Sequence, residues 1–290
     1  MEKITVVFWD VQHGNAVYIK TPNNRHIVID LGTGSYGDNN LEFSPLLYLK
    51  NKWNINQLDY VIITHPHLDH IDDILNFEKL SPKVLSKPPV PREVIEDLLS
   101  QAGEKDKPKF EKYLKLLESY TTHVSSGNDP SNSNNYGGLV IKKFSTTQCS
   151  SSNINNYSII TVISFAGRKI VFTGDNESCS LNKLLENENF KEAVKNADIL
   201  LAPHHGRKSG FHSEFVSLVN PKLTVVSDGR FCDSSASSRY SEKSRGMIVK
   251  KRSSGEKKER YCVTTRKDGC ILVKFGYNEE RKTFMEVSIN

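Results

Sequence analysis

The chain has 290 residues, of which 37% are hydrophobic, and a formal net charge of +5. This length and composition predict one globular domain with a single substantial core. No apolar run approaches the roughly 20 residues that span a bilayer, and the N-terminus enters a strand-like segment directly, so we expect neither a membrane span nor a signal peptide.

The first part of the chain is predicted to form an antiparallel set of strands. Apolar segments at 4–9, 16–20 and 25–30 are separated by turn signals. Asp30 ends the third segment and precedes the loop Leu31-Gly32-Thr33-Gly34. This loop can bring the Asp30 carboxylate to a metal site, or the carboxylate caps the next turn. The apolar spacing predicts covering helices at 41–52, 71–78, 91–99 and 109–120.

The stretch after the next apolar run carries the most distinctive chemistry. His65-Pro66-His67-Leu68-Asp69-His70 directly follows Tyr60-Val61-Ile62-Ile63. His65 and His67 alternate along extended backbone and can face one ion, while Asp69 and His70 turn towards a second. Imidazole and carboxylate ligands without thiolate suit zinc, manganese or iron. The spacing therefore predicts two metal ions.

Two later strands also end in candidate ligands. The polar stretch from Ser125 to Tyr136 is predicted to be a surface loop between two β regions. A hairpin over 157–172 then delivers Thr173-Gly174-Asp175, and a strand over 198–202 ends in Pro203-His204-His205-Gly206. Each of these strands thus presents a metal-binding side chain where it ends.

The five cysteines are odd in number and include no C-x-x-C pair. This pattern predicts reduced thiols in a cytoplasmic protein rather than a disulfide framework. We expect packing or surface roles for all five: Cys149, Cys179, Cys232, Cys262 and Cys270.

The order of these motifs resembles the metallo-β-lactamase superfamily, and within it the hydrolase domain of ComEC-type competence proteins. The resemblance covers nearly the whole chain and implies an α/β (α+β) fold, a four-layer αββα sandwich over residues 1–290 with metals at the edge between two sheets. It is carried by the ligand motifs together with Phe8 to Asn15, Asn155 to Ser158, Phe172 to Asp175, Pro203 to Ser209 and Val263 to Gly269.

The resemblance also implies a ligand set and a nucleophile. A water activated by two divalent ions would attack phosphorus or a carbonyl carbon, and Asp69 would orient it while ligating. His205 is the preferred ligand of the paired histidines, with His204 donating a hydrogen bond to developing oxyanion charge; the reverse assignment stays open. The implied metal ligands are His65 and His67 for one ion, Asp69, His70 and one of His204 or His205 for the other, and Asp175 as the bridge.

The chain departs from the family pattern at several positions. Many members place another histidine on the first metal, and here only His123, in a predicted strand at 121–124, lies in that interval. If His123 is not a ligand, the first site is completed by water or weakly occupied, and Asn156 helps to fill the pocket. Gln12-His13-Gly14-Asn15 replaces a G-Q-G-D turn, and Cys232-Asp233-Ser234-Ser235 replaces a late His-Pro. The chain also has no channel-forming segments.

Substrate contacts are predicted in two places. Lys208 and Ser209 follow the ligand loop and bind a phosphate oxygen, or they are a solvated charge and a helix cap. The segment from Lys243 to Arg260 holds eight basic residues and two acidic ones. Its basic side chains, including Lys250, Lys251 and Arg252, either grip a phosphate backbone without sequence preference or form a solvated basic insertion around 240–260.

Together these features predict a metal-dependent hydrolase, a phosphodiesterase or nuclease acting on DNA or another nucleic acid with two divalent ions, zinc or manganese. The alternatives are a small-nucleotide phosphodiesterase, a lactonase or β-lactamase-type hydrolase, and a catalytically degenerate binding module in a larger assembly. The expected partners are a nucleic acid or nucleotide substrate and, from the resemblance alone, a protein of a DNA-processing or defence assembly.

Overall fold

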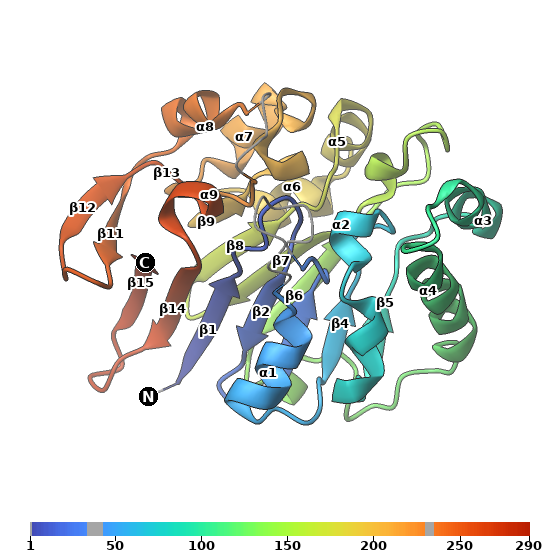
Figure 1. Ribbon diagram of the computed structural model, residues 1–290. Coiled ribbons are helices and arrows are strands. Elements are labelled where there is room, and N and C mark those ends of the chain that lie inside the picture. Colours follow the sequence, from blue (N-terminus) through green and yellow to red (C-terminus); the bar gives the residue numbers. More distant parts are fainter. Residues whose placement is uncertain (1, 34–42, 230–234) are drawn as a thin grey trace.

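The computed structural model in Figure 1 describes residues 2–33, 43–229 and 235–290. The expectations that concern Gly34, residues 41–42 and Cys232 to Ser234 lie outside these ranges. Within them, no helix is both long enough and apolar enough to cross a bilayer.

Two mixed sheets form the centre of the molecule. The nine-stranded sheet has the order β12 (Lys257–Arg260), β11 (Met247–Lys251), β15 (Thr283–Ile289), β14 (Ile271–Tyr277), β1 (Lys3–Phe8), β2 (Val17–Lys20), β3 (His26–Ile29), β4 (Tyr60–Ile62), β5 (Val84–Ser86). The six-stranded sheet has the order β13 (Cys262–Thr264), β10 (Leu223–Val226), β9 (Ile199–Leu201), β8 (Arg168–Phe172), β7 (Ile160–Phe165), β6 (Val140–Phe144).

The sheets pack face to face, and helices pack on the outer face of each sheet. A core of alternate strand residues, such as Val6, Ile19 and Phe172, is buried between the sheets. A second apolar cluster joins the nine-stranded sheet to α1 (Pro45–Trp53), α2 (Leu68–Ile71), η1 (Ile74–Leu80), α3 (Arg92–Gln101) and α4 (Lys107–Ser119). A third joins the other sheet to α5 (Ser178–Leu185), α6 (Glu188–Val194), α7 (Ser213–Val219) and α8 (Ser237–Lys243). The predicted αββα sandwich is therefore confirmed (Figure 1).

Most of the predicted elements are present. The first three strands are antiparallel neighbours, as expected, and the predicted helices coincide with α1, α3 and α4, while the segment at 71–78 is mainly the 3₁₀ helix η1. The predicted strand at 121–124 is wrong: these residues are exposed and form a loop. Thr121, Thr122 and Val124 favour a strand locally, but no neighbouring strand pairs with them within the described ranges.

The expectation of five reduced cysteines is also wrong. Cys149 and Cys179 form a disulfide with their Cα atoms 6.1 Å apart. Thirty positions separate the two residues, and no spacing motif identifies such a pair; the fold brings the loop after β6 against the first turn of α5. Among the described cysteines, Cys262 and Cys270 are free.

Parallel pairing concentrates strand ends at one edge of the sandwich. β3 pairs with β4 in one sheet, and β9 pairs with β8 and β10 in the other, all in parallel. Because parallel strands end on the same side, the residues that follow them meet between the sheets. Those residues include Asp30, His65, Asp175 and His205.

Candidate metal centre

The segment from Thr64 to His70 leaves β4 and turns at once into α2. His67 is extended and stands just before the helix, which begins at Leu68, so Asp69 and His70 lie in its first turn. His65 and His70 are fully buried. The change from strand to helix therefore places side chains of this motif on two sides of one small volume.

The two later ligand loops depend on left-handed backbone. Gly174 has φ +54°, and a Cβ there would lie 2.9 Å from the Cβ atoms of Ser158 and Thr64, so the turn before Asp175 requires glycine. After β9, His204, His205 and Gly206 have φ of 49°, 53° and 70°. Two consecutive non-glycine residues in this region are uncommon in proteins and are typical of functional sites.

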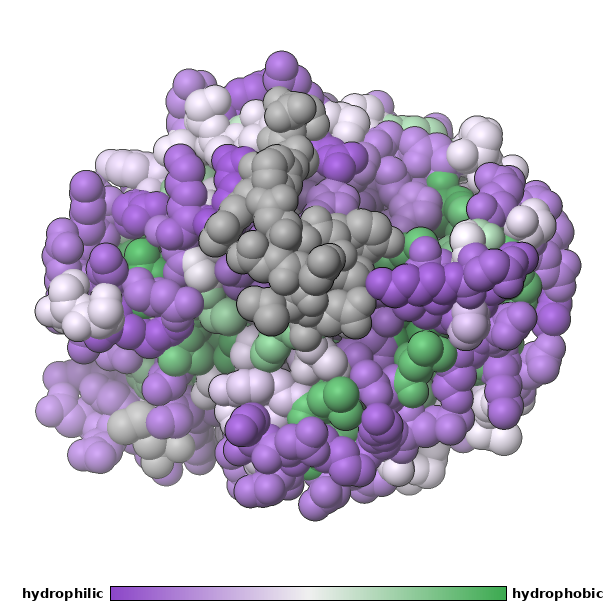
Figure 2. Space-filling view, in the orientation of Figure 1, coloured by the Kyte–Doolittle hydropathy of each residue, from purple (hydrophilic) through white to green (hydrophobic). Residues whose placement is uncertain are grey.

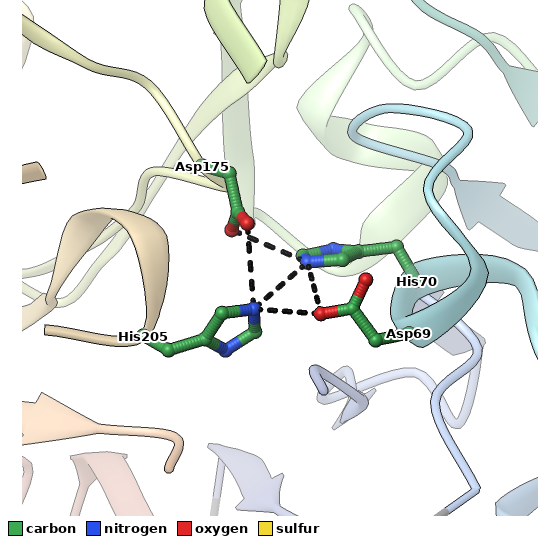
Figure 3. Close-up of side chains that lie close together, drawn as sticks. All are labelled: Asp69, His70, Asp175 and His205. Atoms are coloured by element: carbon green, nitrogen blue, oxygen red, sulfur yellow. Dashed lines mark hydrogen bonds and ion pairs between the residues drawn. The ribbon is translucent and has the colours of Figure 1, made fainter. Parts of the chain in front are cut away.

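Four side chains meet at the centre (Figure 3). The Nε2 atom of His205 lies 2.9 Å from Oδ2 of Asp69 and 3.3 Å from Oδ2 of Asp175. The Nε2 atom of His70 lies 3.2 Å from Oδ1 of Asp175 and 3.3 Å from Nε2 of His205. One potential ligand atom from each residue lies within 4.8 Å of the others.

The electrostatics of this cluster suit a divalent cation. Burial opposes charging of His205, but Asp175 and Asp69 raise its pKa to about 10. Burial likewise opposes charging of His70, yet Asp175, Asp30 and Asp69 raise its pKa well above the ordinary value. The two carboxylates thus hold two protons on the imidazoles, and a divalent cation can replace both.

The outer contacts of the two imidazoles also fit metal binding. Nδ1 of His70 lies 2.8 Å from the fully buried carboxylate of Asp30, and Nδ1 of His205 lies 2.9 Å from the carbonyl oxygen of Ser227. Such contacts fix the ring orientation and leave Nε2 facing the centre, which is the usual arrangement of metal-ligating histidines.

A second group of imidazoles approaches the same carboxylate. Nε2 of His65 lies 3.0 Å from Nδ1 of His67 and 3.8 Å from Oδ2 of Asp175. Nε2 of His204 lies 3.9 Å from the same oxygen. Burial and the neighbouring His70 lower the pKa of His65 well below its ordinary value, so this ring is neutral, as a ligand must be. Asp175 therefore faces both groups.

The structure places the other candidate residues less centrally. His205, and not His204, belongs to the four-residue cluster. Asn156 is nearly fully buried, and its Oδ1 accepts hydrogen bonds from Glu177 and Ser180, which fixes the start of α5. His123 lies in the exposed loop after α4, and the described contacts do not include it in the cluster.

Two groups of candidate substrate-binding residues lie at different distances from the centre. Oγ of Ser209 lies 2.8 Å from Nδ1 of His204, and Lys208 beside it is exposed. Lys250 and Lys251 lie on β11 and Arg252 follows it, five strands from β3 in the sheet order, which is about 24 Å. The fold does not bring these three residues to the centre.

Sequence reasoning missed two contacts and left a third undecided. The sequence left open whether Asp30 lies at the metal site or caps the next turn. In the structure its carboxylate contacts His70, the side chain of Asn15 and Thr64. Glu177 lies 2.9 Å from Nδ1 of His204, and His13 lies 3.5 Å from Asp69. The only sequence signal for them is position: Glu177 stands two residues after Asp175, and His13 lies within a motif that carries the resemblance.

Part of the chain matches a family model, and two curated proteins share low sequence identity with it. Residues 9–118 match the model of the metallo-beta-lactamase superfamily. ComE operon protein 3 of Bacillus subtilis is 25% identical over 244 residues, which cover 76% of this chain and 28% of that protein. Recombination protein 2 of Haemophilus influenzae is 24% identical over 223 residues, which cover 77% of this chain and 24% of that protein. The chain thus spans about a quarter of the length of these relatives.

A solved structure with similarity to this chain is the metallo-beta-lactamase fold protein YhfI of Bacillus subtilis. It has 14% sequence identity and a TM-score of 0.44, and the match covers 80% of this chain and 88% of that one.

Proposed function

We propose that the chain, of which residues 9–118 match the model of the metallo-beta-lactamase superfamily, is a metal-dependent phosphodiesterase of that superfamily that cleaves nucleic acid. The observation that carries the proposal is the cluster of Asp69, His70, Asp175 and His205, whose ligand atoms converge in a buried position. The proposed class of substrate is supported by the similarity to ComE operon protein 3 and to Recombination protein 2, the second of which is named for recombination.

Two divalent ions, zinc or manganese, would fit the two groups of side chains. His65, His67 and Asp175 would hold one, and Asp69, His70, His205 and Asp175 the other. When bound, such ions lower the pKa of a water molecule and polarise a phosphoryl oxygen. Asp69 is held towards the centre by His205 and also approaches His13, so its carboxylate is positioned to orient the attacking water.

His204 is the proposed proton-transfer residue. Burial lowers its pKa, so the ring is neutral near pH 7. Its Nδ1 lies 2.9 Å from the Glu177 carboxylate and 2.8 Å from Oγ of Ser209. In the tautomer that carries its proton on Nδ1, the ring donates a hydrogen bond to the Glu177 carboxylate, and Nε2 can accept a proton. The carboxylate then stabilises the protonated ring, which donates to developing negative charge on the substrate.

The rim of the site offers a further contact for phosphate. Lys208 is exposed one residue before Ser209, which contacts His204. A lysine in this place can pair with a phosphate oxygen of a bound nucleic acid without displacing any metal ligand. The basic sequence pI of about 8.8 favours polyanionic substrates in general.

The test is an activity panel with added zinc or manganese and matched histidine variants. Wild type should hydrolyse a bis-nitrophenyl phosphodiester and DNA. The activity of His70→Ala should be more than about 100-fold lower, because the substitution removes an imidazole ligand from a buried, charged centre. His123→Ala, in the exposed loop, is the control and should keep both activity and metal content. Efficient turnover of a lactam or lactone with every phosphodiester left intact would disprove the proposal.

A further inference from the structure

Helices cover only part of the outer face of the nine-stranded sheet. The helices α1, α3 and α4 pack over the side that contains β1 to β5. Over β14, β15, β11 and β12, Figure 1 shows no covering helix from the described part of the chain, and Ile248 on β11 is 57% exposed. Figure 2, in the same orientation, shows hydrophilic residues over these strands with some hydrophobic residues among them. We propose that this region, the lysine face, defined by Lys20, Lys250, Lys257 and Lys274, binds the phosphate backbone of nucleic acid.

Strand alternation identifies the residues that belong to the lysine face. Val249 and Val273 are buried between the sheets, so Lys250 and Lys274, one residue later on each strand, point to the outer side. Lys257 is directly opposite Lys250 and shares its side. Ile19 is buried in the same core, which places Lys20 on the outer side as well.

Two hollows lie on this face of the sheet. One, of about 450 Å³, is lined by Lys250, Lys257 and Lys274. The other, of about 810 Å³, is lined by Thr5 and Lys20. Thr5 pairs with Lys274 on one side and with Lys20 on the other, so residues that line the two hollows are neighbours in this row of the sheet.

The four lysines of this face take no part in the ion pairs found among the described residues. In the residues that the structure describes, none of the four lysines is in an ion pair, although Glu286 lies opposite Lys274. Lys250 and Lys257 face each other across an antiparallel pair, an arrangement that destabilises a sheet. Edge strands often carry lysine to prevent aggregation, which explains Lys257 on β12 but not the lysines on three interior strands.

The dimensions of the row fit a polymer. From β12 to β2 there are five steps between strands, which is about 24 Å and equals roughly seven base pairs of duplex DNA. A small anion would contact one or two of these lysines, whereas a nucleic-acid backbone can contact all four. The choice of nucleic acid as the polymer rests on the proposed function. Binding to the lysine face can be measured without metal, however, so one proposal can be wrong while the other is right.

The decisive experiment compares two double variants on the same pair of strands. Lys250→Gln with Lys257→Gln removes two lysines of the face. Lys251→Gln with Lys258→Gln removes the same charge from the opposite side, because Lys251 pairs with Ile289 and Lys258 with Val249, both of which are buried in the core. The measurement is fluorescence anisotropy of metal-free protein with labelled duplex and single-stranded DNA over a range of salt concentrations.

Loss of two phosphate contacts should reduce the slope of log K against log salt by about 1.4 to 1.8. At 0.1 M salt this corresponds to roughly sixfold weaker binding per contact, or about 40-fold for the pair. The control pair should lose less than about fivefold, through net charge alone. Lys20→Gln and Lys274→Gln, which lie outside the β11–β12 hairpin, should each weaken binding about sixfold. Thermal unfolding verifies that every variant is folded.

Equal losses in the two double variants, or no loss in either, would overturn the proposal. It would also be overturned if the lysine face bound vesicles with anionic lipid while DNA affinity did not depend on it. If the metal-loaded protein cleaves no phosphodiester but the DNA affinity follows the lysine face, the proposed function fails and the binding surface stands.

Discussion

Asp30 is fully buried, and its carboxylate accepts hydrogen bonds from the backbone N–H and hydroxyl of Thr64 and contacts His70. It fixes the ring that faces the centre without facing the centre itself. Asp30→Asn should therefore lower metal affinity about 10- to 100-fold, measured by competition with a chromogenic chelator. Asp59→Asn is the control: Asp59 is a buried carboxylate at the opposite end of β4, paired with Lys83, and its loss should leave metal affinity unchanged.

The raised pKa of Asp73 should make the free energy of unfolding depend on pH. Burial raises its pKa from 3.8 to about 6, although Asn76, Ser44 and the backbone of Leu46 donate hydrogen bonds to it. Between these values the folded state holds a proton that the unfolded state has released, so the free energy of unfolding falls as pH rises from about 4 to 6. A shift of about two pKa units corresponds to about 3 kcal/mol.

Chemical unfolding of wild type and Asp73→Asn at several pH values checks this dependence. The variant has no titrating group here, so the difference in unfolding free energy, wild type minus variant, should decrease by about 2.4 kcal/mol between pH 4 and 7, because the unfolded side chain is already partly ionised at pH 4. A difference that stays constant with pH would show that Asp73 does not titrate in this range.

Single residues differ in how far the sequence predicts them. His65, His67, Asp69 and His70 fall within six positions, so their spacing alone indicates a metal site. The contact between Glu177 and His204 joins two loops after different strands, and only the folded sheet order brings them together. Local patterns cannot report such contacts, because they depend on tertiary structure.

The loop that carries His205 is an element whose shape depends on one glycine. Gly206 has φ +70°, and a Cβ there would lie 2.8 Å from Cγ1 of Val226 on β10. Gly167, in the β7–β8 turn, has φ +71° but no atom within 4 Å of the same position. The two glycines therefore have nearly the same φ and differ in the space around them.

Substitution by alanine should separate these effects. Gly167→Ala should cost about 1 kcal/mol for left-handed backbone alone. Gly206→Ala should cost about 1 to 3 kcal/mol more, for the contact with Val226, and should also weaken metal binding by moving His205. Denaturant unfolding and metal titration give both quantities. Equal costs at the two positions, with metal affinity retained, would contradict the steric argument.

Elements were predictable where the pattern was long and local. The first strands, α3 and α4 show clear periodicity and were located to within a few residues. The false strand at 121–124 and the missed disulfide between Cys149 and Cys179 share one cause. In both, the outcome depends on whether a distant segment packs alongside, and no short-range pattern reports this.

At the scale of the whole molecule, the candidate ligands come from both halves of the sandwich. Asp69 and His70 follow a strand of the nine-stranded sheet, while Asp175 and His205 follow strands of the six-stranded sheet. A bound ion would therefore tie the two sheets together at one edge, in addition to the apolar core between them.

Metal removal should lower global stability for this reason. At a free metal concentration of about 100 times Kd, one site adds about 2.7 kcal/mol to the free energy of unfolding. Unfolding should be followed in chelator and in buffered zinc, with Asp175→Ala as the control that loses the zinc-dependent increment. A wild type whose midpoint is insensitive to zinc would contradict binding at this centre.

The pairing of β1 with β14 also determines how the chain must reach its fold. Phe8 is opposite Ile271, and the whole of β6 to β10 lies between these strands in sequence. During synthesis one edge of β1 therefore has no partner strand until β14 leaves the ribosome. Contacts between residues so far apart in sequence slow folding and prolong the exposure of unpaired strand edges, which are prone to aggregation. The helices that pack over β1 to β5 precede β14 in sequence, so they can cover part of this sheet before β14 is synthesised.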